Sequence, residues 1–361
     1  MSDSPIPTTP SSADERIERS LSDAERYARQ TLFQGIGRGG QERIGQAQVL
    51  VVGCGALGSV LANNLARAGV GHLRIVDRDY VEGNNLQRQV LYDEDDVRRG
   101  MPKAAAAADN LRRVNSRIEI EPVIADLTAE NVETLIEGMD VVLDGTDNFE
   151  TRYLLNDACL KMGVPWIYSG VIAAYGVTMT ILPGETACLR CVFPERPLPG
   201  TTPTCDTAGV LNGIVGVVAG MAATEGLKLL VGSERLVRGM TWVDLWENTF
   251  DRIELPRQPD CLACGRGEYE YLEAGLDEAG TSLCGRNAVQ VRPPRGTAAT
   301  LDLPALEARL REVGEVTSNG FLLRLRVDGY DVTVFPDARA IVKGTDDTAV
   351  ARGVYAKYVG M

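Results

Sequence analysis

Histidine is almost missing from this sequence: among its 361 residues, the only one is His72. This scarcity argues against a catalytic pair of the Ser–His or Cys–His type, which uses an imidazole as its base. His72 stands directly before a short apolar segment, and we expect it to have a structural role.

Basic residues and long apolar runs are also in short supply. The sequence has 37 Lys and Arg against 50 Asp and Glu, and this net charge of −13 argues against a nucleic-acid binder. No uninterrupted apolar stretch reaches the roughly 18 residues of a membrane helix. The N-terminus has no apolar core behind a basic start, so it lacks the pattern of a secretory signal. We therefore expect a cytoplasmic protein without a membrane segment.

The order of the segments predicts two domains. Residues 1–20 are rich in Ser, Pro and Thr and predict a disordered lead. Residues 21–271 alternate apolar strands with helices, which predicts an α/β, Rossmann-like and mostly parallel sheet with helices on both faces. After a linker, residues 287–361 predict a small α+β domain.

The second half of the larger domain has three distinct segments. Residues 164–183 predict two strands joined by a glycine-rich turn. Residues 193–209 are dense in Pro, Thr and Gly and predict a mobile crossing loop. Residues 210–232 are rich in small and apolar side chains, and predict a tightly packed buried helix.

A glycine-rich turn, GCGALG, lies between a predicted strand and a predicted helix. Gly53, Gly55 and Gly58 let the backbone approach a phosphate, which the N–H groups of the helix N-terminus would bind. Asp77 ends the next strand, where a carboxylate accepts hydrogen bonds from a ribose. Taken alone, this pattern is typical of NAD binding, so a dehydrogenase is an alternative; the sequence has no obvious apparatus for hydride transfer.

Charged and amide side chains follow the later strands of the same pattern. At the carboxyl edge of a parallel sheet they would lie where ligands bind, and one carboxylate could hold Mg²⁺. Any single Arg or Lys here is more typical of a solvated surface, but the set together favours a ligand site. The residues are Asn85 and Arg88 in NNLQRQ, Lys103 in MPKAAAA, and Asp144, Asp147 and Asn148 in DGTDN.

The eight cysteines are more typical of reduced thiols or metal ligands than of disulfides in such a chain. Two CxxC pairs provide four thiolates for tetrahedral Zn²⁺. Their separation exceeds that of a zinc ribbon and suits a structural site that joins two distant parts of one domain. The predicted ligands are Cys188, Cys191, Cys261 and Cys264. We expect Cys54 and Cys159 to be packed in the core.

The motifs RYARQ, GCGALG, DRDYVEGNNLQRQ, PK, DGTDN and the two CxxC pairs resemble the ThiF/MoeB family of sulfur-carrier-protein adenylyltransferases, relatives of the ubiquitin-activating enzymes. The resemblance runs from about residue 22 to 266. It implies ATP- and Mg²⁺-dependent adenylation of the C-terminal carboxylate of a small ubiquitin-like sulfur carrier ending in Gly-Gly. Pyrophosphate would leave, and the carrier would be ready for thiocarboxylate formation with a sulfur donor protein.

The resemblance also implies roles for individual residues. Asp77 would bind the ribose of ATP, and Asp147 would organise Mg²⁺ with Asn148 beside it. Arg29 would reach into the site of a partner subunit, which implies a homodimer. The glycine turn has Ala56 where some members have a further glycine, and we still expect it to bind ATP. The residues expected to contact the ATP phosphates are Asn85, Arg88 and Lys103.

Cys205 lies in the crossing loop, in the segment TCDTAG. It resembles the family position that forms a covalent link in some members and is dispensable in others. A second enzyme hypothesis is therefore a Cys205 thioester that passes a ubiquitin-like protein to a conjugating partner. The neighbouring Asp206 disfavours a thiolate, and the sequence leaves open whether Cys205 reacts.

Two further points stay open at this stage. A third hypothesis is a catalytically silent scaffold, which the intact set of Arg88, Lys103 and Asp147 argues against. The domain of residues 287–361 either recruits the carrier or another partner, or stabilises the protein. It has no cysteine beyond Cys284, whose role the resemblance does not explain.

Overall fold

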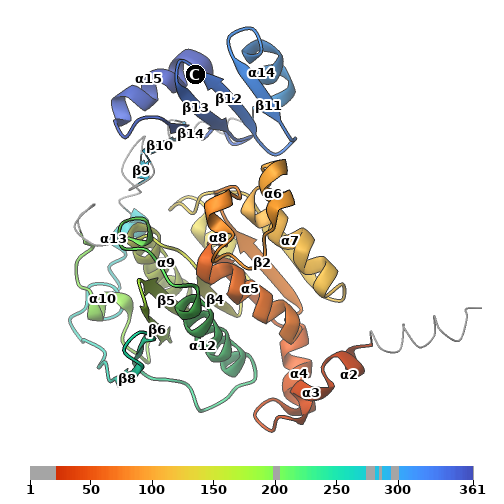
Figure 1. Cartoon of the computed structure of the whole chain (residues 1–361). Helices are drawn as coiled ribbons and strands as arrows, with labels where there is room; N and C mark the ends of the chain where they lie inside the picture. The colour runs from red at the N-terminus through yellow and green to blue at the C-terminus, as the bar shows by residue number, and fades with distance from the viewer. Residues whose placement is uncertain (1–21, 198–203, 274–280, 284–286, 294–300, 361) are drawn as a thin grey trace, which may run out of the picture.

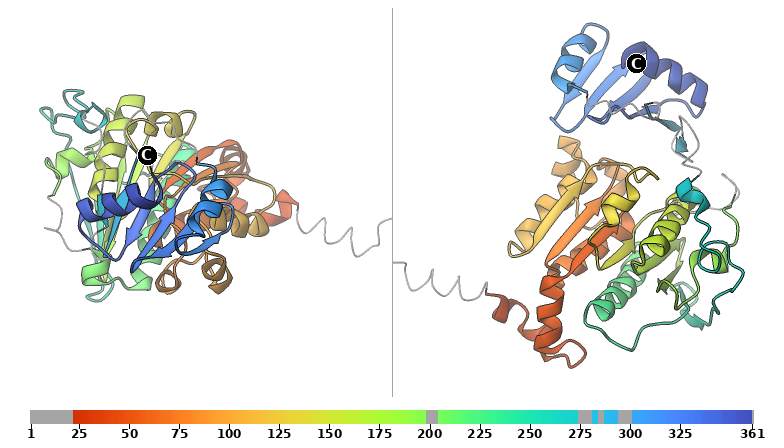
Figure 2. Two further views of the ribbon diagram at one scale, coloured as in Figure 1. Left: turned by 90° about the horizontal axis from the view of Figure 1, so that it is seen from above. Right: turned by 180° about the vertical axis from the view of Figure 1, so that it is seen from behind.

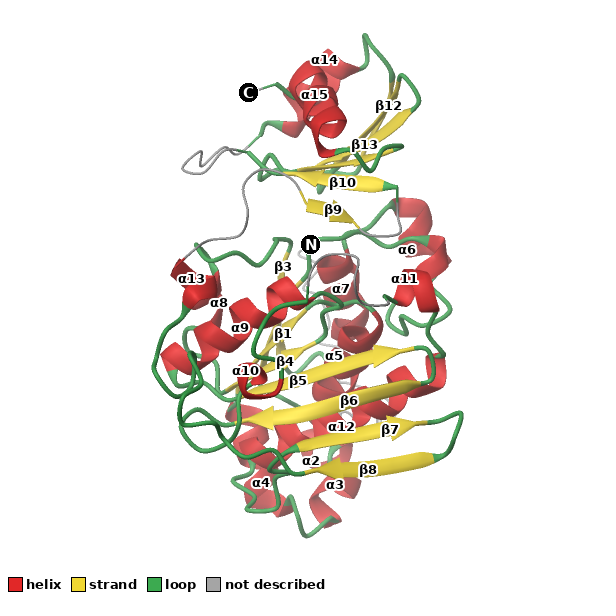
Figure 3. Cartoon of the chain, turned by 90° about the vertical axis from the view of Figure 1, so that its left-hand side faces the viewer, coloured by secondary structure: helices red, strands yellow, loops and turns green. Residues whose placement is uncertain are grey.

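The computed structural model describes residues 22–197, 204–273, 281–283, 287–293 and 301–360. The predicted lead, residues 1–20, lies outside the described residues. The larger domain is built on an eight-stranded sheet with the order β3-β2-β1-β4-β5-β6-β7-β8 (Figure 3). Its strands are β1 Gln48–Val52, β2 His72–Val76, β3 Glu119–Val123, β4 Val141–Asp144, β5 Trp166–Ile172, β6 Tyr175–Ile181, β7 Met240–Asp244 and β8 Thr249–Ile253.

The sheet is mixed. The strands from β3 to β5 pair in parallel, whereas the pairs from β5 to β8 are antiparallel. The predicted α/β class is confirmed, as are the two strands joined by a turn, which are β5 and β6. The antiparallel strands β7 and β8 were not predicted; β8 is exposed along its whole length, including its apolar residues Phe250 and Ile253.

Helices cover both faces of this sheet (Figure 1). Alternation along β1 explains why: Val49 and Val51 enter one apolar core, while Leu50 and Val52 enter the other. Helices α4, α5, α7 and α12 pack on the first face, and α8, α9 and α10 on the second. The helices are α2 Asp23–Arg26, α3 Ala28–Leu32, α4 Gly37–Gln46, α5 Ala56–Ala68, η1 Gly83–Asn85, α6 Glu94–Arg99, α7 Lys103–Val114, α8 Val132–Ile136, α9 Phe149–Met162, α10 Leu189–Val192, α11 Cys205–Ala208, α12 Asn212–Leu230 and α13 Glu270–Glu273.

Helix α12 is half buried, not fully buried as its composition suggested. Ile214, Val218 and Ala222 pack against the sheet, whereas Gly216 and Thr224 are exposed. In the described part of the chain it is the one helix long and apolar enough to cross a membrane, with 44% of its apolar window buried. Its packing against α5 and strands β4 to β6 gives its apolar face a place in the core.

The C-terminal domain is a six-stranded antiparallel sheet with the order β11-β12-β13-β14-β10-β9. Helices α14 and α15 pack on one face of it, and the other face contacts the larger domain; the sequence predicts a small α+β domain here. Cys284 lies outside the described residues. The elements are β9 Thr281–Leu283, β10 Ala288–Val291, α14 Leu303–Leu310, β11 Glu315–Ser318, β12 Leu323–Val327, β13 Tyr330–Val334, β14 Ala340–Lys343 and α15 Thr348–Tyr358.

Candidate active site

The glycine turn joins β1 to α5 and is packed backbone to backbone. Gly53 has a φ of +80°, and a Cβ on Gly58 would lie 1.8 Å from the carbonyl oxygen of Gly53. At Gly55, by contrast, a Cβ would meet only the Gln89 side chain, at 3.8 Å. No side chain caps the N-terminus of α5. The turn therefore leaves backbone N–H groups and the positive end of the helix dipole available to a phosphate.

Asp77 is anchored beside this turn. Its Oδ2 accepts a hydrogen bond from the Cys54 N–H at 2.6 Å, and its Oδ1 accepts one from the Asp79 N–H at 2.7 Å. Burial raises the pKa of the Asp77 carboxyl, and the nearby Lys103 acts in the opposite direction. The side chain thus has a fixed position at the end of β2, where the sequence predicts a ribose contact.

Lys103 begins α7 and places a buried cation at the same edge. Only 4% of the residue is exposed, and Nζ lies 3.2 Å from Oδ2 of Asp79. The Tyr92 hydroxyl donates to the carbonyl of Cys54 at 2.6 Å, which ties the segment before α7 to the glycine turn. Lys103 and Asp77 are therefore brought together, as the sequence predicts.

In the NNLQRQ segment, Asn85 and Arg88 differ in burial and in their hydrogen-bond partners. Asn85 is buried and closes η1, because its Oδ1 accepts from the Glu82 N–H at 3.0 Å. Arg88 is partly exposed, and its Nη1 donates to the carbonyl of Asn84 at 2.8 Å. The Asn85 side chain is thus engaged in the cap of η1, while the Arg88 guanidinium retains exposed donors.

Gln89 is a residue that the sequence reasoning missed. It is 4% exposed, lies next to Gly55, and its buried Oε1 has no hydrogen-bond partner. An unpartnered buried acceptor is costly, and its place beside the glycine turn supports a ligand there. Its position next to Arg88 in NNLQRQ is the signal that would have indicated it.

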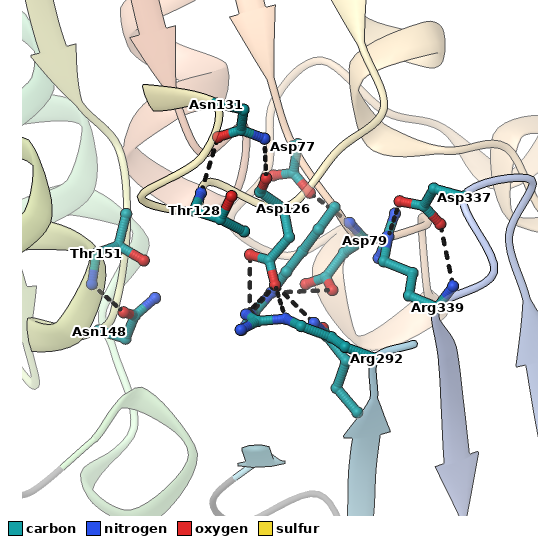
Figure 4. A network of polar contacts seen from close by, with 12 residues as sticks. Asp77, Asp79, Asp126, Thr128, Asn131, Asn148, Thr151, Arg292, Asp337 and Arg339 are labelled. Carbon is teal, nitrogen blue, oxygen red and sulfur yellow. Dashed lines mark hydrogen bonds and ion pairs between the residues drawn. The ribbon is translucent and has the colours of Figure 1, made fainter. Parts of the chain in front are cut away.

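The two carboxylates of the DGTDN segment, at the end of β4, differ in burial and in their contacts. Asp144 is fully buried and accepts from the Nε of Arg152 at 3.0 Å, so it is engaged within the protein. Burial raises its pKa, against the effect of Arg152. Asp147 is exposed, and Asn148 caps α9 by accepting from the Thr151 N–H at 2.8 Å (Figure 4). Asp147 is therefore the carboxylate of this set that is placed to hold a cation.

Arg29 is not brought to this edge. It is exposed on α3, and its neighbour Gln30 donates to the carbonyl of Ala68 at 2.9 Å, at the last residue of α5. The glycine turn is at the opposite end of α5, and a helix of 13 residues is about 20 Å long. Figure 2 shows the N-terminal helices at the end of the molecule opposite to the C-terminal domain. The predicted role of Arg29 thus requires a second subunit.

Cys205 lies at the same edge as the DGTDN segment. It begins α11, and its Sγ is 3.6 Å from the carbonyl oxygen of Val171 near the end of β5. Strand β5 is the parallel neighbour of β4, so the fold places this thiol one strand away from Asp147. Residues 198–203 of the predicted crossing loop are outside the described part.

The four predicted zinc ligands come together from two segments. Their Sγ atoms all lie within 4.8 Å of one another, with Cys188–Cys261 at 3.6 Å and Cys191–Cys264 at 3.3 Å. A tetrahedral zinc with bonds of about 2.3 Å separates its sulfurs by about 3.8 Å. Burial raises the pKa of Cys264 to about 11, whereas a hydrogen bond from Cys188 lowers that of Cys191 to about 4. The spacing of the four sulfurs is therefore compatible with a tetrahedral metal site.

The remaining described cysteines and the histidine are structural, as expected. Cys54 and Cys159 are fully buried in the two cores of the larger domain, and burial raises the pKa of Cys54 to about 12. His72 lies at the start of β2, with its Nε2 3.0 Å from Glu121 and its Nδ1 3.3 Å from Gln48. None of these side chains supplies a base to the site.

These features define a nucleotide-binding α/β protein of the Rossmann-like class. They are a glycine turn and a buried lysine at the edge of parallel strands, and a cysteine cluster away from that edge. Within that class, residues 27–263 match the ThiF family, and the chain belongs to this family.

The relatives support this assignment along most of the chain. A sulfur carrier protein ThiS adenylyltransferase of Bacillus subtilis is 42% identical over 340 residues, which is 93% of this chain and 99% of the relative. A SAMP-activating enzyme E1 of Haloferax volcanii is 42% identical over 250 residues, 69% of this chain and 92% of the relative. A crystal structure of E. coli MccB has a TM-score of 0.59 at 21% identity, covering 70% of this chain and 80% of that one, and supports the fold.

Proposed function

We propose that this chain adenylates the C-terminal carboxylate of a small ubiquitin-like sulfur carrier, with ATP and Mg²⁺. The observation that carries the proposal is the match to a ThiS adenylyltransferase over 99% of that relative's length. The buried Lys103 and the exposed Asp147, at one strand edge with the glycine turn, provide the charges that such a reaction needs. Membership of the ThiF family disfavours the dehydrogenase hypothesis.

The reaction requires positioning and charge, and no general base. The carrier's terminal carboxylate is ionised at neutral pH, and its oxygen attacks the α-phosphorus of ATP. A new P–O bond forms, the bond to the β-phosphate bridging oxygen breaks, and pyrophosphate leaves. Arg88, Lys103 and the N-terminus of α5 stabilise the negative charge that moves onto the leaving group. Mg²⁺ held by Asp147 would supply further positive charge.

We also propose Zn²⁺ as the ion of the cysteine cluster. The support is the geometry of four sulfurs at tetrahedral spacing, from α10 and from the segment after β8. Four thiolates leave no open position for a substrate, so the role of the ion is structural. Reduced cysteine ligands also fit a protein of the cytoplasm, which is the location we propose.

A homodimer is the third part of the proposal. Arg29 lies far from the site of its own chain, and the neighbouring side chains Leu32 and Phe33 are 71% and 66% exposed. At the turn between β7 and β8, Trp246 is 75% exposed. A second copy would cover these apolar side chains and bring Arg29 towards its partner's site.

The thioester hypothesis remains the second candidate, because the Cys205 thiol lies one strand from Asp147. In that case Cys205 attacks the carrier's acyl carbon as a thiolate, and AMP leaves with the pair of electrons of the broken C–O bond. The product would be a carrier thioester that a conjugating partner accepts. Without this step, the acyl-adenylate goes directly to a sulfur donor.

The test is pyrophosphate exchange with a ubiquitin-like carrier ending in Gly-Gly, together with mass spectrometry of the carrier. We expect exchange that depends on the carrier and an AMP adduct at its terminus, and neither with a carrier that lacks the last glycine. Absence of both with every such carrier would contradict the proposal. The variant Cys205→Ser keeps exchange in either case and loses a covalent enzyme–carrier adduct only if the thioester forms.

A further inference from the structure

The C-terminal domain packs on the loops that follow β2 and β3, next to the nucleotide edge. Phe335 and Ile341 of that domain form one apolar cluster with Tyr80, and Ile124 packs against it. The guanidinium of Arg324 lies 4.2 Å above the ring of Tyr80. Polar contacts extend the interface: Lys343 pairs with Glu82, and Asn319 donates to the carbonyls of Arg99 and Gly100, each at 2.9 Å.

Asp126 is the polar centre of this interface (Figure 4). From the C-terminal domain, Gln290 donates its Nε2 to Oδ2 of Asp126 at 2.6 Å, and the Nε of Arg292 donates to the same oxygen at 3.0 Å. From the larger domain, Nη1 of Arg78 lies 3.3 Å from Oδ1. Burial acts to raise the pKa of Asp126, but Arg78 and Arg292 lower it below its usual value. The carboxylate is therefore charged and held from both sides.

The contacts continue from Asp126 to the reacting end of the site. Arg78 also lies 4.0 Å from Asp79, whose other oxygen is 3.2 Å from Nζ of Lys103. The N–H of Asp79 donates to Asp77 at 2.7 Å. A row of alternating charges thus runs from the C-terminal domain to the lysine and to the proposed ribose ligand.

The direction of this row matches the direction in which a nucleotide extends. The glycine turn after β1 would bind phosphates and Asp77 after β2 the ribose, so the base projects towards the ends of β2 and β3. The segments there carry Arg78 and Asp126. Asn131 holds the loop of Asp126 by donating to its carbonyl at 2.8 Å and accepting from the Thr128 N–H at 2.8 Å. The C-terminal domain therefore contacts the segments after β2 and β3 on the side where the base would lie.

Gln290 gives a second reason to connect this interface with the site. It is fully buried, and its Oε1 has no hydrogen-bond partner. A buried acceptor without a partner destabilises the folded chain, because its lost hydration is not replaced. Strain of this kind collects at functional positions more than in purely structural contacts.

We propose that the C-terminal domain is a fixed part of the nucleotide site, and that Arg292 is a positioning residue for nucleoside binding which acts through Asp126 and Arg78. The inference rests on the proposed adenylation. Loss of Arg292 leaves Asp126 with Arg78 as its cation, and the row of charges towards Asp79 and Lys103 rearranges. The affinity for ATP falls, whereas the chemical step and the affinity for the carrier change little.

The experiment is a comparison of full-length variants in carrier-dependent pyrophosphate exchange, with the affinity for Mg-ATP measured separately by titration calorimetry. For Arg292→Ala we expect the KM and Kd for ATP to rise about 10-fold with kcat within about 2-fold, as for residues within a coupled network. Arg292→Lys should recover part of the affinity. The matched control is Arg326→Ala, since Arg326 is exposed in the same domain and its ion pair within the described residues is with the exposed Glu315, at 3.6 Å.

The results separate a failure of this inference from a failure of the proposed adenylation. An unchanged affinity for ATP in Arg292→Ala, or a rise in the KM for the carrier alone, would overturn the inference while leaving the adenylation intact. Wild-type protein without ATP binding or exchange would instead contradict the proposed function. If Arg292→Ala does not fold, Asp126→Asn keeps the shape of the side chain and is measured in the same way; ATP affinity equal to the wild type would again overturn the inference.

Discussion

The nucleotide edge and the cysteine cluster use polar side chains in opposite ways. In the cluster, all four sulfurs point towards one centre, and no candidate ligand is directed elsewhere. At the nucleotide edge, Asp77 and Lys103 are held within the protein, but Asp147 is exposed and the Oε1 of Gln89 has no partner. A structural site closes on itself, whereas a site that binds and releases substrates leaves some groups unsatisfied.

The largest effect should come from Asp147→Ala. We expect adenylation to fall about 10²–10³-fold, because the exposed carboxylate is the proposed Mg²⁺ ligand. The melting temperature should stay the same, since the side chain supports no packing. Initial rates of pyrophosphate exchange and a thermal melt measure both effects. The control is Asp346→Ala, another exposed aspartate; near-normal activity of Asp147→Ala would show that another carboxylate holds the ion.

The opposite pattern should follow from Cys261→Ser. Loss of one of four ligands releases the metal, and the free energy of unfolding should fall by several kcal/mol. The affinity for ATP in the folded fraction should not change, because the cluster is separate from the glycine turn. Metal analysis and denaturant unfolding test this. Cys159→Ala serves as the control: it removes a buried thiol outside the cluster and should keep the metal. A wild-type protein that contains no metal, with a Cys261→Ser variant of the same stability, would refute the zinc proposal.

A smaller effect is the pH dependence of stability that Asp157 causes in the part of the larger domain that carries the cysteine cluster. Asp157 on α9 is buried and accepts from the Tyr271 N–H of α13 at 3.0 Å, and burial raises its pKa to about 6. The unfolded value is lower, near 3.8, so the folded state binds this proton more tightly. As the pH rises from about 4 to above 6, this group therefore removes stability.

Replacement of this carboxyl should flatten that part of the pH dependence. At pH 8 we expect Asp157→Asn to be more stable than the wild type by on the order of 2 kcal/mol, and the difference should shrink at pH 5. Chemical unfolding at several pH values measures it. Parallel stability curves for the two proteins would show that the Asp157 carboxyl has no raised pKa.

The same two regions show what sequence can predict. The glycine turn and each CxxC pair are local patterns with spacings of a few residues, and Asp77 is marked by its place at the end of the next strand; the structure assembles them as expected. Arg152 carries no such pattern, and Gln89 is indicated only by its place beside Arg88 in NNLQRQ. The contact of Arg78 and Arg292 with Asp126 joins two domains, and no periodicity along the chain relates these positions. The strand β8 and the exposed face of α12 were missed for a similar reason: composition does not tell which partner covers a face.

The cysteine cluster also has a consequence for the unfolded chain. It joins the segment at Cys191 to that at Cys261 and so encloses a ring of about 70 residues that contains Cys205, α12 and two strands of the sheet. Closing a ring of this size removes about 4 kcal/mol worth of conformational entropy from an unfolded chain that retains the cross-link. A metal ion that remained bound during unfolding would therefore restrict the search for the antiparallel half of the sheet. It would act on the folding of that half before any substrate is bound.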